Sequence, residues 1–184
     1  MARMSRTRTS WILICVLAVS SVVAASPSPR VRSTDRAIAA LMAEAESRSP
    51  SFRSLVRTIE RTDGIVYVER GRCGHGVHAC LTHSIVAGES FRLLRIIVDG
   101  VGSPIQLMAV IGHELQHAVE LLSDHAVRSA AAAYLYYARE APTARDSFAP
   151  FETTAAVRAG ITIEGELEHA ANFVRVTEQA GNGH

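Results

Sequence analysis

Two histidines and a glutamate at helical spacing form the pattern in this sequence that is best suited to chemistry. His113 and His117 flank the run HELQH, in which Glu114 follows the first histidine. In a helix, residues four apart lie one turn apart on one face, so both imidazoles can reach a single ion. Zn²⁺ accepts nitrogen ligands in a tetrahedral shell and brings the pKa of a bound water towards neutrality. Glu114 would lie beside that water, where its carboxylate can take a proton as the water attacks a polarised carbonyl.

The helix expected to carry this run extends from about Pro104 to Ser123, with Ser103 as its capping residue. Its apolar face would comprise Leu107, Ile111, Leu115, Ala118 and Leu122. The opposite, polar stripe would carry His113, His117, Glu120 and Asp124. Two histidines on a polar stripe are easier to explain as metal ligands than as core residues, so the pattern indicates a metal site.

The HELQH run resembles the HExxH motif of the zincin metallopeptidases, which carry it on a central helix beneath a small sheet. The resemblance covers the motif and, more loosely, the order of elements from about residue 64 to 170. It implies that His113 and His117 are zinc ligands and that Glu114 is the general base. It also implies that the substrate is a peptide or protein, bound by strand addition at a sheet edge.

The third metal ligand separates the branches of the zincins. The metzincin continuation, HExxHxxGxxH, needs a glycine where this chain has Glu120 and a histidine where it has Ser123, so that branch is excluded. A gluzincin-like site takes a glutamate from a later helix. Glu152 fits best, because it opens the predicted last helix and matches the ExxA part of an ExxAD pattern. Ala156 stands where the aspartate would be, which leaves the orienting partner of the histidines unassigned.

Other side chains remain alternatives for this third ligand. Glu120 shares the histidine stripe, although a residue so near on the same helix more often orients a ligand than binds the ion. Asp124 and His125 follow just beyond it. Three glutamates of the last predicted helix are expected to face mostly solvent: Glu164, Glu166 and Glu168.

Two of the three cysteines lie in a histidine-rich segment in the middle of the chain. Cys73 and Cys80 are accompanied there by His75, His78 and His83, so a second metal site is one interpretation. The spacing, with glycines between the ligands, matches no standard zinc-finger pattern. In an oxidising compartment a disulfide is the simpler interpretation, and its short loop would pin local geometry.

Residues 1–25 have the layout of a secretory signal peptide. Three arginines precede an apolar run from Trp11 to Ala25 that ends in small residues. We predict cleavage after Ala25, with an uncleaved anchor as the alternative. The protein is then expected to be secreted or periplasmic, with no stable membrane insertion once the signal is removed.

The remaining pattern predicts an α+β fold. After a flexible leader at 26–34, a single catalytic domain is expected over residues 35–180, with N-terminal and C-terminal helices around the HExxH helix. Helices are predicted at about 35–48, from Pro50 to the turn at 63–64, at 125–140 and at 151–178. Strands are predicted at 65–68, 80–87 and 91–98, with a hairpin connection at 88–90. The expected sheet is small, mainly antiparallel and packed on the HExxH helix.

Length and charge narrow the possible functions. The 184 residues suffice for one domain with a core, and the formal net charge of +1 argues against a broadly basic nucleic-acid-binding protein. We therefore expect no nucleic-acid partner, and the oligomeric state is not encoded in these patterns. The alternative to an enzyme is a catalytically inactive zincin-like protein that binds metal or a partner.

Overall fold

The computed structural model describes residues 28–74, 76–82, 84–140 and 151–181. The predicted signal peptide and the loop at 142–150 lie outside these residues. Among the described residues, no helix combines the length and hydropathy that crossing a bilayer requires.

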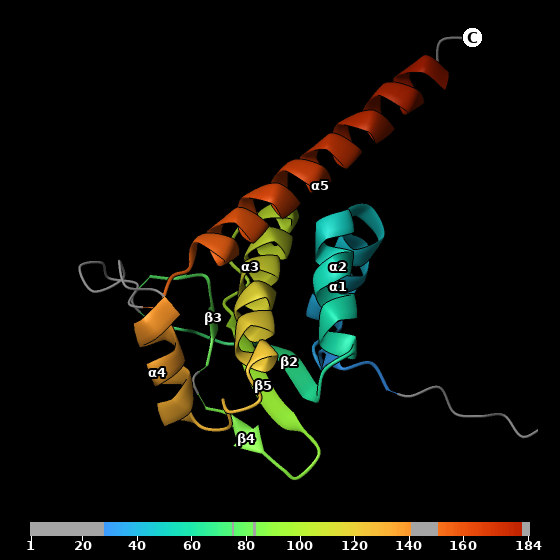
Figure 1. The fold of residues 1–184 in the computed structure, drawn as a ribbon. Coiled ribbons are helices and arrows are strands. Elements are labelled where there is room, and N and C mark those ends of the chain that lie inside the picture. The colour runs from blue at the N-terminus through green and yellow to red at the C-terminus, as the bar shows by residue number, and fades with distance from the viewer. Residues whose placement is uncertain (1–27, 75, 83, 141–150, 182–184) are drawn as a thin grey trace, which may run out of the picture.

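The described part of the chain contains five helices and one mixed sheet of five strands, an α+β architecture. The helices are α1 (Arg36–Arg48), α2 (Pro50–Glu60), α3 (Pro104–Ser123), α4 (Ala130–Glu140) and α5 (Thr154–Gly181). The strands are β1 (Val31–Arg32), β2 (Gly64–Arg70), β3 (Ala79–Leu81), β4 (Val86–Ala87) and β5 (Arg92–Val98). In Figure 1, α3 runs through the middle of the molecule, α1 and α2 lie on one side of it and α4 on the other, and α5 crosses α3 and projects beyond the body.

The prediction of a mainly antiparallel sheet is wrong. The strand order is β1-β2-β5-β3, with β4 also paired to β5. The longest ladder, β2 with β5, is parallel and runs from Gly64↔Arg92 to Arg70↔Val98, and β1 pairs with β2 in parallel too. The antiparallel partners of β5 are the short strands β3 and β4. The β4–β5 hairpin was predictable because it is local, whereas the β2–β5 ladder joins strands separated by a long connection.

Two predicted elements differ in extent. The strand expected at 80–87 is two short strands, β3 and β4. Val31 and Arg32, in the predicted leader, form β1, where Val31 is buried and pairs with Val66. Burial of the Val31 side chain and pairing with the edge of β2 hold this part of the chain in place.

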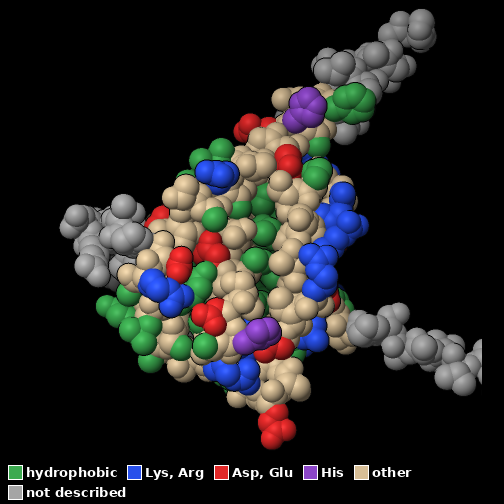
Figure 2. All heavy atoms as spheres, in the orientation of Figure 1, with side chains coloured by type: hydrophobic (Ala, Val, Ile, Leu, Met, Phe, Trp, Pro, Cys, Tyr) green, Lys and Arg blue, Asp and Glu red, His purple; other side chains and the backbone are tan. Residues whose placement is uncertain are grey.

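The helices begin where the sequence offers caps. Asp35 accepts hydrogen bonds from the first turn of α1, Ser49 caps α2, and Ser103 forms a capping box with Gln106 at α3. All five residues of the predicted apolar face of α3 are buried, and the helix contacts the strands β2, β3 and β5 as well as α1, α2 and α5. Figure 2 shows arginine side chains gathered over α1 and α2, on the side of the molecule away from α4.

Helix α5 packs closely on α3 because a glycine lies at their contact. A Cβ added to Gly112 would lie 2.3 Å from Cδ1 of Ile163, so any larger residue would have to displace that side chain. Glu166 of α5, which we expected in solvent, is half-buried. Its carboxylate accepts hydrogen bonds from Ser49 Oγ and from the backbone and hydroxyl of Ser51, so it ties α5 to the joint between α1 and α2.

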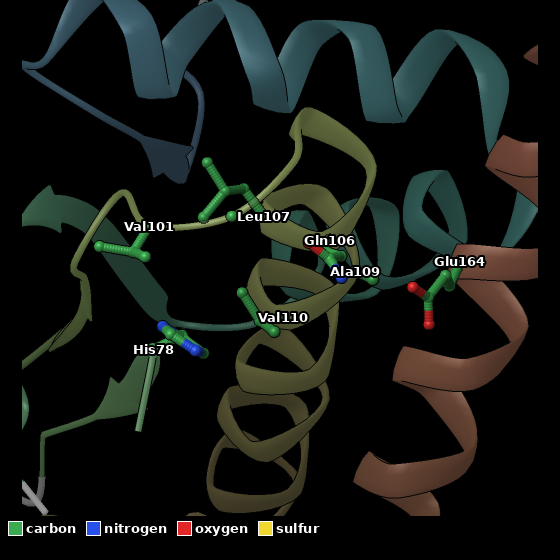
Figure 3. Close-up of a pocket in the computed structure, with 8 residues that line it drawn as sticks. His78, Val101, Gln106, Leu107, Ala109, Val110 and Glu164 are labelled. Carbon is green, nitrogen blue, oxygen red and sulfur yellow. The ribbon is translucent and has the colours of Figure 1, made fainter. Parts of the chain in front are cut away.

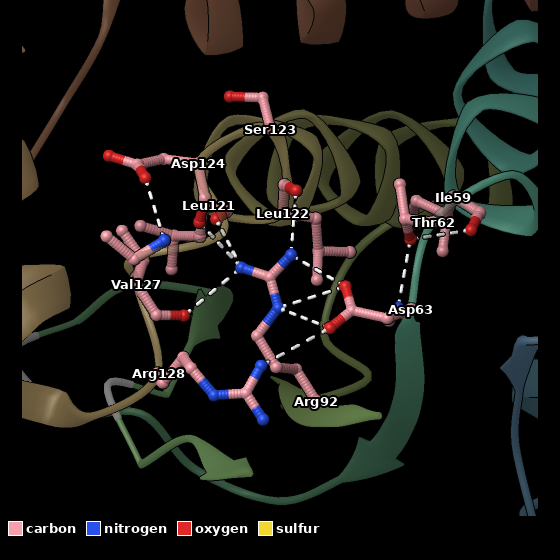
Figure 4. A network of polar contacts seen from close by, with 12 residues as sticks. Ile59, Thr62, Asp63, Arg92, Leu121, Leu122, Ser123, Asp124, Val127 and Arg128 are labelled. Carbon is pink, nitrogen blue, oxygen red and sulfur yellow. Dashed lines mark hydrogen bonds and ion pairs between the residues drawn. The ribbon is translucent and has the colours of Figure 1, made fainter. Parts of the chain in front are cut away.

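A buried arginine holds the C-terminal end of α3 (Figure 4). The Arg92 side chain is 1% exposed, and it pairs with the carboxylate of Asp63 at the start of β2. Its remaining N–H groups donate to the carbonyls of Leu121, Leu122, Asp124 and Val127. Helix-terminal carbonyls lack partners within the helix, and a cation there also complements the helix dipole. Arg92 therefore joins the sheet to the end of α3.

This network also explains why α4 starts at Ala130 rather than near residue 125. The carbonyls of Asp124 and Val127 accept hydrogen bonds from Arg92, so the segment between α3 and α4 is shaped around the guanidinium. A helix starting at 125 would direct these carbonyls along its own axis instead.

We expect Arg92→Ala to lower the free energy of unfolding by about 3–5 kcal/mol, because removing one partner of a buried ion pair leaves the other polar groups unsatisfied. Chemical denaturation measures the loss. The control is Arg95→Ala, whose guanidinium is half-exposed beside Glu69 and should contribute less than about 1 kcal/mol. Equal losses in the two variants would contradict the role assigned to Arg92.

The same pair predicts a loss of stability in acid. The hydrogen bond from Arg92 lowers the pKa of Asp63 below its usual 3.8. A carboxyl whose folded-state pKa is lowered stabilises the protein above its unfolded pKa, and this contribution disappears as the pH falls through the folded pKa. The difference in unfolding free energy between the wild type and Asp63→Asn should therefore shrink between neutral pH and about pH 2. A difference that stays constant over this range would rule out the linkage.

Candidate metal centre

The three residues proposed as metal ligands lie together. One ligand atom from each of His113, His117 and Glu152 lies within 4.8 Å of the other two. Glu152 Oε1 is 3.3 Å from Nε2 of His113 and 3.6 Å from Nε2 of His117. Ligands at about 2.0–2.1 Å from a tetrahedral ion are separated from one another by about 3.3 Å. The group can therefore hold a metal ion.

The state of Glu152 also fits a cation site. Its Oε1 atom is buried and has no hydrogen-bond partner among the described residues. Burial alone would raise the pKa of this carboxyl, but the adjacent His113 and His117 lower it to about 2. A buried carboxylate oxygen without a donor is costly unless a positive charge faces it.

Glu152 precedes α5 instead of opening it, which corrects the predicted start of the last helix. The helix begins at Thr154, and Thr153 caps it by accepting a hydrogen bond from the backbone N–H of Ala156. Glu152 thus belongs to the segment just before α5, and its side chain faces the histidines of α3.

Glu120 orients His117 rather than providing the third ligand. Its Oε2 lies 3.0 Å from Nδ1 of His117, so the Nε2 of that ring is directed towards Glu152. Oε1 of Glu120 accepts a hydrogen bond of 2.7 Å from the Thr153 hydroxyl. Burial alone would lower the pKa of His117, but the carboxylates of Glu120 and Glu152 outweigh it and raise the pKa to about 9. A histidine and carboxylate paired in this way are typical of the surroundings of a metal ligand.

Sequence reasoning missed Thr153 in this role, whereas for Glu120 it had already named the orientation of a ligand as the more usual role of a residue so near on the same helix. The spacing of His117 and Glu120, three residues apart on one helix face, was the available signal for their pairing. No local pattern connects Glu120 to Thr153, because these residues meet only when α5 packs on α3.

Glu114 is buried between α3 and the sheet. Its Oε2 accepts a hydrogen bond of 2.6 Å from the backbone N–H of Leu81 in β3. Burial raises the pKa of the Glu114 carboxyl, and the nearby His117 and His113 oppose that rise. The Glu114 carboxylate thus lies close to both histidines. It is held by β3, whereas Glu152 reaches the histidines from the segment before α5.

Packing around the histidines restricts their rings. His113 and His117 meet edge to face at 4.9 Å between ring centroids, and His117 meets Tyr137 of α4 at 5.5 Å. The buried Tyr137 hydroxyl donates to the carbonyl of His117. On the other side, a Cβ on Gly160 would lie 3.4 Å from that of His113. α4 and α5 therefore confine the rings from both sides.

The cysteine-rich segment contains a disulfide. Cys73 and Cys80 are bonded, with their Cα atoms 5.9 Å apart, so these two side chains do not form a second metal site. His78 contacts Asp99, with Nδ1 2.9 Å from Oδ2, while His75 and His83 lie outside the described residues. The disulfide indicates an oxidising compartment.

No known protein-family model, curated protein or solved structure matches this chain.

We expect one divalent metal ion per chain, held by the three ligands. Glu152→Ala should lose most of the metal affinity, and Glu120→Gln should lower it by about 10–100-fold, because the orienting carboxylate is removed. Competition with a chromophoric chelator measures both. Glu168→Gln, an exposed site on α5, is the control and should bind like the wild type. Wild-type affinity in Glu152→Ala would exclude this ligand set.

Proposed function

We propose that this protein is an exported zinc-dependent peptidase with a gluzincin-like site. The observation that carries the proposal is the convergence of Glu152 with the two HExxH histidines, beside the buried Glu114. Two imidazoles and one carboxylate are the donor set of several catalytic zinc sites, which leave one coordination position open. When bound, zinc would supply a Lewis acid that polarises a scissile carbonyl and eases deprotonation of water.

Glu114 is the general base in this proposal. Its carboxylate accepts the proton of the attacking water and returns it to the leaving amine. A base is most effective when its pKa is near the working pH, and burial shifts the pKa of Glu114 in that direction. The backbone N–H of Leu81 holds one carboxylate oxygen, so the group keeps its direction through both proton transfers.

Glu120 has a supporting role. It accepts a hydrogen bond from His117 Nδ1, which leaves Nε2 with its lone pair available to an ion. Thr153 in turn fixes Glu120. The adjacent residues Glu152 and Thr153 therefore have complementary roles in this proposal. Glu152 is a ligand, and Thr153 holds Glu120, which orients the ligand His117.

A peptide substrate is favoured by the position of β3. This strand is at the edge of the described sheet, beyond β5, and it packs against α3. An extended peptide can pair with such an edge and pass over the face of α3 that carries the histidines. Leu81, which binds Glu114, belongs to this strand.

Export is supported by two independent features. The disulfide requires an oxidising environment to persist, and residues 1–25 have the composition of a signal peptide. Together they favour a secreted or periplasmic enzyme.

Glu114→Gln should keep stoichiometric zinc and reduce kcat by about 10²–10⁴-fold, because the amide cannot accept the proton. Hydrolysis of a quenched-fluorescent peptide library and metal analysis of the same samples measure both properties. Glu168→Gln is again the control and should match the wild type. Full activity in Glu114→Gln would refute the mechanism. A zinc-loaded wild type that cleaves no peptide would instead support an inactive metal-binding protein.

A further inference from the structure

A cavity of about 340 Å³ lies along the N-terminal half of α3 (Figure 3). Leu107 and Val110 provide apolar surface on α3. His78 stands on the side of the sheet, and Glu164 reaches towards α3 from α5 on the opposite side. Val101, 61% exposed, lies at the solvent-facing rim. Cavities of this volume accommodate a small molecule or a long side chain.

The cavity continues the face of α3 that carries the metal centre. Gln106, Val110, His113 and His117 follow one another at spacings of four, three and four residues, which places them on one helix face. On α5, Gly160 lies against His113, and Glu164 follows one turn later, about 5.4 Å along the axis. Glu164, which lines the cavity, therefore lies about one helical turn from the glycine that contacts His113, and that glycine has no side chain to stand between them.

The residues that line the cavity provide aliphatic surface, the polar side chains of His78 and Gln106, and one carboxylate, that of Glu164. In the described part of the chain, Glu164 forms neither a salt bridge nor a side-chain hydrogen bond, although its residue is only partly exposed. His78, across the cavity, is already paired with Asp99. Nothing within the described cavity neutralises Glu164.

We propose that this cavity is a substrate subsite for a basic side chain, arginine above all, and that Glu164 sets the preference. The aliphatic stem would lie on Leu107 and Val110, and the guanidinium would reach the carboxylate of Glu164. A purely apolar side chain would shield Glu164 from water without giving it a partner, which is unfavourable. This inference rests on the proposed peptidase activity and names its substrate class: peptides with a basic residue beside the scissile bond.

Peptides that carry arginine or its neutral isostere citrulline test the subsite. A library randomised on both sides of the cleaved bond should show arginine and lysine enriched at one position. For that position, the ratio of kcat/KM for the arginine peptide to that for the citrulline peptide should fall at least about tenfold in Glu164→Gln. Glu164→Arg should shift the preference to acidic side chains. Glu168→Gln, one turn further along α5 and exposed, should keep the wild-type ratio.

A binding measurement that needs no turnover separates the two proposals. Calorimetry on the metal-free wild type should show tighter binding of acetyl-Ala-Arg-Ala-amide than of its citrulline counterpart, and Glu164→Gln should abolish the difference. If zinc-loaded protein cleaves no peptide but this difference is present, the peptidase proposal fails, and the cavity stands as a binding site for a basic side chain but not as a substrate subsite. If peptides are cleaved without a basic preference, or the preference survives in Glu164→Gln, the subsite is refuted and the peptidase proposal stands.

Discussion

The guanidinium of Arg92 is the point on which the arrangement of the molecule depends, because it joins three elements that the chain order keeps apart. It binds Asp63 at the start of β2, extends from the start of β5 and caps the last carbonyls of α3. A helix that carries a candidate metal site in its middle has to be held at both ends for that site to keep its geometry. Ser103 fixes the N-terminal end locally, and Arg92 fixes the C-terminal end through the sheet. The second attachment adds to the packing of α3 on α5 and β3 in setting where the histidines lie.

Three carboxylates crowd around the two histidines, and each is held by a different part of the fold. Glu114 is held by the backbone of β3, Glu120 by the hydroxyl of Thr153, and Glu152 by the histidines themselves. Such a concentration of negative charge in a partly buried place is unfavourable unless cations share it. The raised pKa of His117 in the metal-free protein reflects this need for positive charge. A bound divalent ion would supply that charge in place of a proton.

Much of the helical architecture and part of the site were predictable because they depend on local spacing. The bounds of α3, its buried face and the pairing of its histidines follow from 3.6-residue periodicity and a capping serine. The disulfide was predicted from two cysteines that follow a predicted signal peptide, and the structure contains it. The parallel β2–β5 ladder and the role of Arg92 were not predictable in this way. No local sequence pattern indicates which strand will pair with β5, or which carbonyls the arginine at its start will bind.

By itself, the sequence determined which residues can bind a metal and on which face of a helix two of them lie, because helical geometry relates neighbours in the chain. The tertiary structure decided the rest. It brought Glu152 to the histidines from beyond α4, joined Glu120 to Thr153, and placed Glu164 in the lining of the cavity along the N-terminal half of α3. These outcomes depend on how α5 packs on α3, and the close contact at Gly112 that permits this packing involves residues far apart in sequence. Hydrophobic periodicity predicts the buried face of a single helix or strand, whereas the candidate site is formed by residues of α3 and of the segment before α5.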